Sequence, residues 1–387
     1  MVDQGRLALV TNPMLAERHG YGVMATRKTR TKEMTVSPVR LACIDVENYK
    51  SLDRATLELP PPKTADQLDA FVLGSKNGVG KSSLLECCAF AMIGAVMPDA
   101  LLGRGRRVAE LSSPNGILIR SGSETATIRA RITVGKQTDE LSLILRQNGF
   151  DLTQPHIEWN QHLDPTWLRN LDEGDLLDSV LGWNSEPLII PPILLFHSYR
   201  KVLEGTSALG AMVDPSYHRR VGPPRRYGGP GPLSTFKVVL VQSLMAKSGL
   251  FEGMDSQQDS EPVLEKLNGL IEGFARGRVD KLRPGPDGTL ELRVAPVNGG
   301  ASFSFDGLSS GQKEIIATLF LIWYTTQDRP SLVLIDEPEL HLNAEWQRVF
   351  VHKLAELAPA NQYVLATHSE EIFSSVTEDR RMLLERE

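Results

Sequence analysis

The clearest pattern of hydrophobic and polar positions lies in the last third of the chain. Short apolar runs at Leu332–Ile335 and Tyr363–Ala366 have the length of buried strands. Apolar residues recur at helical spacing in Lys313–Thr325 and in Ala344–Leu357, and a further helix begins at Ser369–Phe373. Because strands that alternate with helices usually form a parallel sheet, we predict such a sheet for this region.

An earlier strand and helix flank a loop that contains glycine. Ala70–Leu73 is a short apolar run, and the helix after the loop extends from Ser82 to about Met97. Apolar residues surround most of this helix, which is typical of a helix at the centre of a fold. Before it, Leu41–Val46 is predicted to form a strand whose hairpin partner is Thr56–Leu59.

The middle of the chain gives shorter and less regular signals. The predicted strands there are Gly116–Arg120, Thr125–Val134, Glu140–Arg146, Leu188–Phe196, Thr289–Val294 and Ser302–Phe305. The predicted helices are Pro165–Leu181, Thr235–Ala246 and Glu261–Arg276. We therefore predict a flexible extension over residues 1–37 and one domain over residues 38–387, with less regular insertions at about 98–186 and 205–300.

Composition narrows the class of protein. The chain has 387 residues, 41% of them hydrophobic, and a formal net charge of −6, which argues against a generally basic mode of nucleic-acid binding. No stretch reaches the roughly 18–20 apolar residues that span a bilayer, so we expect no membrane association. Cys43, Cys87 and Cys88 suggest neither a disulfide framework nor a metal cluster, and we expect a cytoplasmic protein.

The loop before the central helix has the spacing of a phosphate-binding loop. It reads Ser75-Lys76-Asn77-Gly78-Val79-Gly80-Lys81-Ser82, with Ser75 where the pattern has glycine. Gly78 and Gly80 let the backbone curl so that its N–H groups face phosphates, and the N-terminus of the following helix favours the same anion. We expect Lys81 to reach the β- and γ-phosphates and the Ser82 hydroxyl to bind Mg²⁺. The residues predicted to bind the nucleotide here are Asn77, Gly78, Val79, Gly80, Lys81, Ser82 and Ser83.

Two acidic residues end an apolar strand of the last third. Asp336 and Glu337 directly follow Leu332–Ile335. Asp336 is a candidate Mg²⁺ partner that acts through water, because Mg²⁺ keeps much of its hydration shell. Glu337 is the candidate base that positions an attacking water. Adjacent acids usually lie in an exposed turn, but the buried strand before this pair favours a functional site.

Two further segments lie next to the predicted parallel strands. Gly307–Gln312 is a loop of serine and glycine before a helix, which by itself is typical of a helix cap. Ser309 lies 27 residues before Asp336, and this position favours a role at the nucleotide. His368 follows the strand Tyr363–Ala366, at the strand end beside the expected nucleotide, where we expect it to sense the γ-phosphate.

In this order, the four segments resemble the ABC-type ATPase heads of the SMC, RecF and OLD-like group. Ser75–Ser82 is similar to Walker A, Leu308–Gln312 to the LSGGQ signature with Ser310 in place of one glycine, Leu332–Glu337 to Walker B, and His368 to the switch histidine. The run Asp336–Leu342 resembles the bacterial AAA proteins of this group, several of which serve in antiphage defence.

The resemblance implies a fold, cofactors and a partner. The fold would be an α/β head of the ABC-ATPase type, with mixed and parallel sheets, a P-loop NTPase core and inserted α/β segments. ATP and Mg²⁺ would be the cofactors, and hydrolysis would depend on Lys81, Glu337 and His368. A head-to-tail homodimer would hold ATP between Lys81 of one chain and three residues of the other, namely Ser309, Ser310 and Gly311.

The function that the resemblance implies is ATP hydrolysis that regulates a separate effector, a nuclease, in antiphage defence. Only 19 residues follow His368, so we expect the effector activity to reside in a partner protein. The alternative is a RecF-like ATPase of DNA repair. In that case basic side chains would grip DNA phosphates and two tyrosines would stack on bases. The candidates are Arg219, Arg220, Arg225 and Arg226, with Tyr217 and Tyr227, and also Arg104, Arg106 and Arg107. In an acidic chain, a solvated or partner-facing loop is the simpler interpretation.

Two other functions are less favoured. In a transporter subunit, Lys81 and Ser309 would lie closer in sequence than the 228 residues found here. Such a subunit would also need a coupling glutamine, and none of Gln137, Gln147 and Gln154 is convincing. A module that keeps ATP as a structural ligand would not need an intact set of Lys81, Asp336, Glu337 and His368.

Overall fold

The computed structural model describes residues 39–74, 78–102, 115–147, 149–153, 173–183, 187–202, 207–208, 234–247, 260–284, 289–327 and 329–385. All of them belong to one compact unit, Val36–Glu387. The predicted extension over residues 1–37 lies outside the described residues, and so does the first part of the helix predicted over Pro165–Leu181, residues 165–172, whereas α5 (Glu173–Val180) is described.

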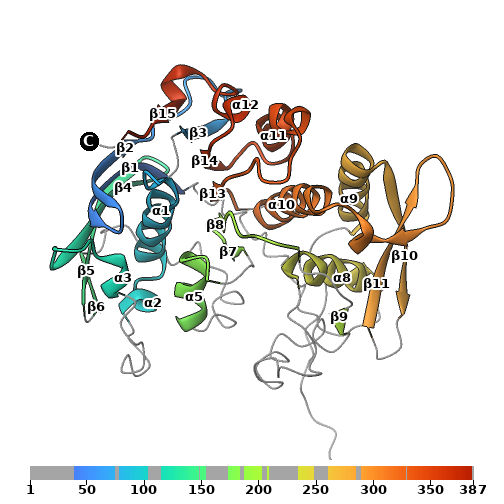
Figure 1. The fold of residues 1–387 in the computed structure, drawn as a ribbon, viewed down its shortest axis with the longest axis horizontal. Helices are drawn as coiled ribbons and strands as arrows, with labels where there is room; N and C mark the ends of the chain where they lie inside the picture. Colours follow the sequence, from blue (N-terminus) through green and yellow to red (C-terminus); the bar gives the residue numbers. More distant parts are fainter. Residues whose placement is uncertain are drawn as a thin grey trace, which may run out of the picture. The chain divides into compact units, whose positions relative to one another are not determined.

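A six-stranded sheet forms the centre of this unit, in the order β15-β3-β14-β13-β8-β7 (Figure 1). The strands are β3 (Asp69–Gly74), β7 (Leu188–Ile190), β8 (Ile193–Phe196), β13 (Leu332–Asp336), β14 (Gln362–Thr367) and β15 (Arg381–Leu383). All neighbouring pairs are parallel except β7 with β8, which form an antiparallel hairpin. The predicted parallel sheet is therefore confirmed.

A five-stranded antiparallel sheet lies beside the parallel one, in the order β2-β1-β4-β5-β6. Its strands are β1 (Val39–Tyr49), β2 (Leu52–Glu58), β4 (Thr125–Val134), β5 (Gln137–Arg146) and β6 (Gly149–Thr153). Buried and more exposed residues alternate along β4, as expected for a sheet that is covered on one face. The hairpin predicted for the first two strands is confirmed, and so is the α/β fold class with mixed and parallel sheets.

Helix α1 (Lys81–Val96) packs between the two sheets, and Figure 1 shows it on the opposite side of the parallel sheet from α10 (Ser310–Thr326). Every residue from Ser83 to Val96 is buried. This burial explains why the helix lacks a polar face, and it confirms the central position predicted from its sequence.

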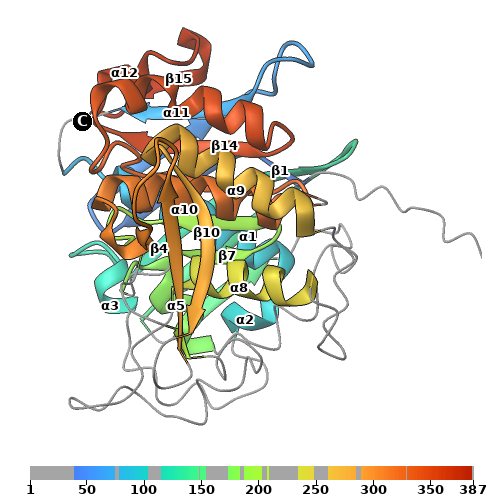
Figure 2. The same cartoon turned by 90° about the vertical axis from the view of Figure 1, so that its right-hand side faces the viewer.

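Four helices and a small sheet cover the other face of the parallel sheet (Figure 2). The helices are α8 (Thr235–Lys247), α9 (Ser260–Ala275), α10 and α11 (Ala344–Leu357). The small sheet contains β9 (Ser207–Ala208), β10 (Gly277–Pro284), β11 (Thr289–Pro296) and β12 (Phe303–Ser304). Alternate residues of the parallel strands face opposite sides of the sheet. In β13, Leu332 and Leu334 pack towards α1, whereas Val333 and Ile335 pack towards α10. The described part also contains three short α-helices, namely α2 (Pro98–Leu102), α3 (Asn115–Leu118) and α12 (Glu370–Phe373).

Three predictions for strands need correction. Gly116–Arg120 is not a continuous strand, because Asn115–Leu118 forms α3. Only Ile119 pairs, in an isolated antiparallel bridge with Tyr49: the Lys50 N–H donates to the Leu118 carbonyl, and the Arg120 N–H donates to the Asn48 carbonyl. Leu188–Phe196 is two strands rather than one, with a turn at Pro191 and Pro192. Ser302–Phe305 contains only the two-residue β12, because a 3₁₀ turn begins at Phe305.

The side chain of Gln362 joins the two large sheets. Its amide oxygen accepts the Leu41 N–H at 2.8 Å, and its amide nitrogen donates to the Leu41 carbonyl at 2.7 Å. Leu41 lies where a bulge shifts the register between β1 and β4, so the glutamine amide replaces a strand partner for its main chain. Both residues are buried, and water cannot take over these bonds.

Gln362→Ala should therefore lower the free energy of unfolding by about 2–4 kcal/mol, because two buried main-chain groups lose their partners. Urea unfolding of the full chain measures this loss. Gln137→Ala, at an exposed position of β5, is the matched control and should change stability by less than about 0.5 kcal/mol. Equal losses in the two variants would contradict the role assigned to Gln362.

Candidate active site at the edge of the parallel sheet

The pairing of three parallel strands brings the predicted motifs to one edge. Gly74, which ends β3, pairs with Thr367, which ends β14, and Asp336, which ends β13, pairs with Ala366. The carboxyl ends of these strands are therefore level, and the residues just beyond them meet. Ligands of open parallel sheets bind in the crevice outside the carboxyl ends of the strands.

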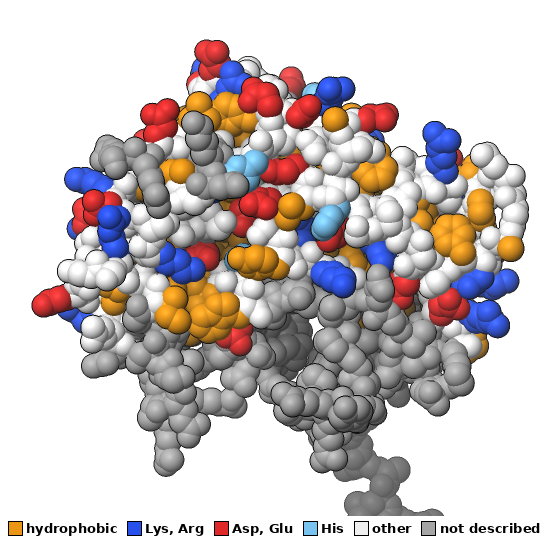
Figure 3. All heavy atoms as spheres, in the orientation of Figure 1, with side chains coloured by type: hydrophobic (Ala, Val, Ile, Leu, Met, Phe, Trp, Pro, Cys, Tyr) orange, Lys and Arg blue, Asp and Glu red, His pale blue; other side chains and the backbone are white. Residues whose placement is uncertain are grey.

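The first residues of α1 contact the ends of β13 and β14. The Lys81 ammonium lies 2.8 Å from Nε2 of His368, and the Ser82 hydroxyl donates to Oδ2 of Asp336 at 2.7 Å. Nε2 of His368 lies 3.7 Å from Oε1 of Glu337. Five of the residues predicted from separate motifs thus form one cluster, and Figure 3 shows histidine and acidic side chains side by side near the middle of this face.

The oxygens of Ser82 and Asp336 fit a magnesium ion. Asp336 is buried, and its Oδ1 atom has no hydrogen-bond partner. Burial raises the pKa of this carboxyl, which a neighbouring cation would counteract. The described residues contain no group of three or more histidine, cysteine, aspartate or glutamate side chains that could hold a metal. Mg²⁺ is usually bound by one or two carboxylates together with phosphate oxygens and water, and the Ser82 hydroxyl and the Asp336 carboxylate could hold it in this way.

Glu337 has a left-handed backbone, with a φ of 46°. This conformation costs a residue other than glycine about 1–3 kcal/mol, so the surroundings must hold it. The Glu337 N–H donates to the Ala366 carbonyl at 2.8 Å, and the Glu337 carbonyl accepts the Leu340 N–H at 3.1 Å. Burial raises the pKa of the Glu337 carboxyl, and the negative charges of Asp336 and Glu339 raise it further. A raised pKa makes a carboxylate a better proton acceptor.

Glu339 orients the end of β14, a role that the sequence did not reveal. One carboxylate oxygen accepts the Thr367 hydroxyl at 2.7 Å, and the other accepts the His368 N–H at 2.6 Å. Glu339 belongs to the acidic run after β13, but nothing in that run indicates which of its acids binds main chain. Arg200 is a second residue that the sequence did not reveal, since it belongs to no motif, yet it donates to the carbonyls of Asp336 and Glu337.

The two glycines of the phosphate loop differ in their surroundings. Gly78 has a φ of 79° and open space around it, whereas Gly80 has a φ of 102° and lies against the turn after β1. A Cβ at position 80 would lie 2.4 Å from Cδ2 of Leu52. Val79 is half-buried, and Ser83 is buried in the first turn of α1. Asn77, like Ser75 and Lys76, lies outside the described residues.

The signature-like loop starts a helix on the other face of the parallel sheet. Ser309 caps α10 and forms a reciprocal capping box with Gln312. Ser309 and Ser310 are exposed, whereas Gly311 is buried where a Cβ would lie 2.1 Å from the His341 carbonyl oxygen. The predicted meeting of Ser309, Ser310 and Gly311 with Lys81 of a second chain stays a prediction.

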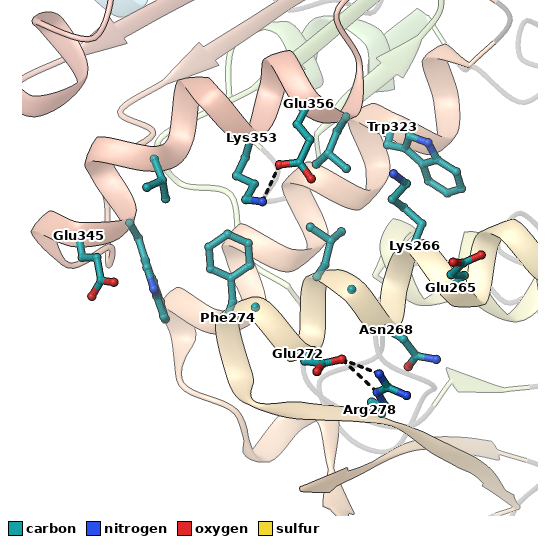
Figure 4. Close-up of a pocket in the computed structure, with 16 residues that line it drawn as sticks. Glu265, Lys266, Asn268, Glu272, Phe274, Arg278, Trp323, Glu345, Lys353 and Glu356 are labelled. Atoms are coloured by element: carbon teal, nitrogen blue, oxygen red, sulfur yellow. Dashed lines mark hydrogen bonds and ion pairs between the residues drawn. The ribbon is translucent and has the colours of Figure 1, made fainter. Parts of the chain in front are cut away.

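A separate groove of about 960 Å³ lies between α9, α10 and α11 (Figure 4). Phe274, Trp323 and Trp346 are among its lining residues, and none of the predicted site residues is. Its charged side chains include two ion pairs, Arg278 with Glu272 and Lys353 with Glu356, drawn as dashed lines in Figure 4. None of the residues predicted to bind or hydrolyse the nucleotide lines this groove, so it is separate from the candidate site.

Several candidates from the sequence are not part of this cluster. Gln137 begins β5 in the antiparallel sheet and Gln147 follows that strand, while Gln154 lies outside the described residues. All the arginines and tyrosines proposed to bind DNA also lie outside them, namely Arg104, Arg106, Arg107, Tyr217, Arg219, Arg220, Arg225, Arg226 and Tyr227. In the part of the chain that the structure describes, no helix is long and apolar enough to cross a membrane.

The two glycines provide a matched test of the loop. Gly78→Ala adds only backbone strain, whereas Gly80→Ala adds the same strain and a clash with Leu52. Gly78→Ala should cost about 1–2 kcal/mol of folding free energy, and Gly80→Ala should cost at least about 1 kcal/mol more. Urea unfolding of both variants measures the difference, and a larger loss in Gly78→Ala would refute this account of the turn.

Comparison with known proteins adds independent information about part of the chain. Residues 249–374 match a family model described as an AAA domain, putative AbiEii toxin, Type IV TA system. The Retron Vc95 probable ATPase of Vibrio cholerae serotype O1 biovar El Tor is 32% identical over 102 residues, which are 24% of this chain and 20% of that protein. The chain thus matches about a fifth of the length of this curated relative.

Solved structures of two kinds are also similar. The SmcHead bound to the C-winged helix domain of ScpA has a TM-score of 0.49 at 13% identity, over 87% of this chain and 91% of that chain. The recombination mediator protein RecF in the RecFOR pathway has a TM-score of 0.45 at 13% identity, over 91% of this chain and 97% of that chain.

The match to the family model falls on the segment that carries three of the predicted motifs. Residues 249–374 contain the loop at Ser309, the acidic pair Asp336 and Glu337, and His368, whereas the phosphate loop lies before this segment. The chain is therefore similar to an AAA domain over residues 249–374 and, over 102 residues, to a probable ATPase, and the resemblance predicted from its motifs is confirmed.

Proposed function

We propose that the chain binds ATP with Mg²⁺, hydrolyses it to ADP and phosphate, and does so in a site that a second copy completes. The observation that carries this proposal is the convergence of Lys81, Ser82, Asp336, Glu337 and His368 at one edge of the parallel sheet. They come from three separate segments, and each carries the type of side chain that phosphoryl transfer to water requires.

Lys81 binds the phosphates in this proposal. Burial lowers the pKa of Lys81, while the carboxylates of Asp336, Glu337 and Glu339 counteract that effect. Phosphate oxygens would favour the charged ammonium further. Mg²⁺ held by Ser82 and Asp336 would neutralise charge that develops on the phosphate oxygens during transfer.

Glu337 accepts the proton of the attacking water, and His368 lies between this base and Lys81. The His368 ring is within 3.7 Å of the Glu337 carboxylate and within 2.8 Å of the Lys81 ammonium, so it can report a γ-phosphate to the base. Glu339 supports this geometry because it holds the main chain of His368. These contacts favour hydrolysis over passive retention of ATP.

A second chain would supply the loop at Ser309. Ser309 and Ser310 are exposed at the N-terminus of a seventeen-residue helix, a position that favours an anion. ATP between two chains would stabilise a closed homodimer, and hydrolysis would release it. We propose that this cycle regulates a separate effector protein, a nuclease, in antiphage defence, on the strength of the sequence similarity to bacterial AAA proteins. The arginines and tyrosines that would support the alternative role in DNA repair lie outside the described residues.

Glu337→Gln tests the assigned base. The amide keeps the size of the side chain but cannot accept the proton, so turnover should fall by at least about 100-fold while ATP still binds. The trapped ATP should make dimer accumulate. Release of phosphate measures turnover, and light scattering after size exclusion with ATP and Mg²⁺ measures the dimer.

Lys81→Ala is the control for nucleotide binding and should bind ATP more weakly without accumulating dimer. Normal turnover by Glu337→Gln would show that another group is the base. Monomeric Glu337→Gln at saturating ATP would remove the support for a composite site.

A further inference from the structure

The end of β13 leaves one main-chain carbonyl without a strand partner. The N–H of Glu337 points towards β14, where it bonds to Ala366. The carbonyl of Asp336 belongs to the same trans peptide unit and therefore points the opposite way, towards β8. Pairing between β13 and β8 ends at Ile335 and Phe196, so β8 offers no further N–H at this level. A buried carbonyl in this position needs another donor.

Arg200 supplies that donor from the turn that follows β8. The turn is closed by the Arg200 N–H, which donates to the His197 carbonyl at 3.1 Å. Nη1 then donates to the Asp336 carbonyl at 2.7 Å and Nη2 to the Glu337 carbonyl at 3.2 Å. The planar guanidinium thus spans two successive carbonyls, which a lysine ammonium could not do with the same geometry.

The Arg200 guanidinium is buried and forms its hydrogen bonds with main-chain carbonyls. The residue is only 9% exposed, and its Nη1 atom also donates to the His197 carbonyl at 2.9 Å. Its described hydrogen bonds all end on main-chain oxygens, and its Nε–H is buried without a partner. A buried cation of this kind is unfavourable on its own, so its contacts must be maintained for the segment to stay in place.

The two carbonyls that Arg200 holds flank the left-handed residue of the candidate site. Glu337 has a φ of 46°, and this backbone angle determines where its carboxylate points. The Glu337 carbonyl is shared between Arg200 and the Leu340 N–H, which closes the turn after the strand. Without the guanidinium, the peptide unit between Asp336 and Glu337 keeps its bond to β14 but loses its anchor on the other side.

We propose that Arg200 is a positioning residue that fixes the peptide unit between Asp336 and Glu337, so that the Glu337 carboxylate is held in line with the attacking water. The hydrogen bonds of the Arg200 guanidinium all end on main-chain carbonyls, so in this proposal it acts through Glu337. This role rests on the proposed ATP hydrolysis, but the main-chain anchor itself does not depend on it.

Arg200→Ala and Arg200→Lys in the full chain test this role by two independent measurements. A small misplacement of the base should lower kcat by about 100-fold in Arg200→Ala. The dissociation constant of a non-hydrolysable ATP analogue should stay within about threefold, because Arg200 does not contact the phosphates. Arg200→Lys should keep the fold and the charge but recover only part of kcat, since it lacks the planar fork.

Hydrogen exchange without nucleotide measures the anchor directly. The peptide covering residues 336–342 should exchange roughly tenfold faster in Arg200→Ala, whereas peptides of β1 should not change. Millimolar guanidinium chloride should restore both the protection of this peptide and part of kcat, because Arg200 borders a small open cavity beside α10 that the substitution enlarges. Guanidinium should not restore turnover to Glu337→Gln.

Arg293→Ala is the matched control, because Arg293 also donates to a main-chain carbonyl, that of Ser302, but in the small sheet. It should leave kcat unchanged. Wild-type kcat in Arg200→Ala would overturn the proposal, and so would faster exchange that spreads equally to β1 and is not reversed by guanidinium. If the wild-type chain did not hydrolyse ATP, the proposed function would fail, yet unchanged exchange of residues 336–342 in Arg200→Ala would separately refute the anchor.

Discussion

The candidate site depends on one constraint, the in-register parallel pairing of β3, β14, β13 and β8. Because the paired residues Gly74, Thr367 and Asp336 end their strands within one register position of each other, the segments beyond them must converge. The shift of a single strand by one residue would bury its polar terminus or withdraw it from the cluster. Packing on both faces opposes such a shift, since alternate residues of each strand belong to different cores.

The side chains at this edge of the parallel sheet fall into two groups with different roles. Lys81, Ser82, Asp336, Glu337 and His368 present charges and hydroxyls to the space beyond the strands. Glu339 and Arg200 instead bind the main chain beneath them, at His368 and at the Asp336–Glu337 peptide respectively. The contacts of the second group hold the left-handed backbone of Glu337 at the end of β13. They also fix the main chain that carries Glu337 and His368 at the edge of the sheet.

The sequence predicted those parts of the fold whose signals are local. The run from β3 through the glycine loop to α1 carries its own strand, turn and buried-helix pattern, and Ala344–Leu357 was predicted with the observed bounds. Prediction failed where distant groups decide the structure. Gly116–Arg120 pairs with β1 only through an isolated bridge between Ile119 and Tyr49, and the exposed, charged strand β10 has no apolar alternation that would indicate a strand. Arg200 and Glu339 were missed because they recognise main-chain atoms, which no side-chain motif encodes.

We propose that each chain provides only part of a composite ATP site, and a mixing experiment tests this proposal most directly. Lys81→Ala removes the phosphate-binding lysine, whereas Ser309→Asp keeps a good helix cap but places a negative charge where phosphate is proposed to bind. Each variant alone should be inactive. An equal mixture should recover about a quarter of wild-type turnover, because half of the randomly formed dimers contain one intact site. A mixture as inactive as its two folded components, or full activity of Ser309→Asp alone, would contradict the composite site.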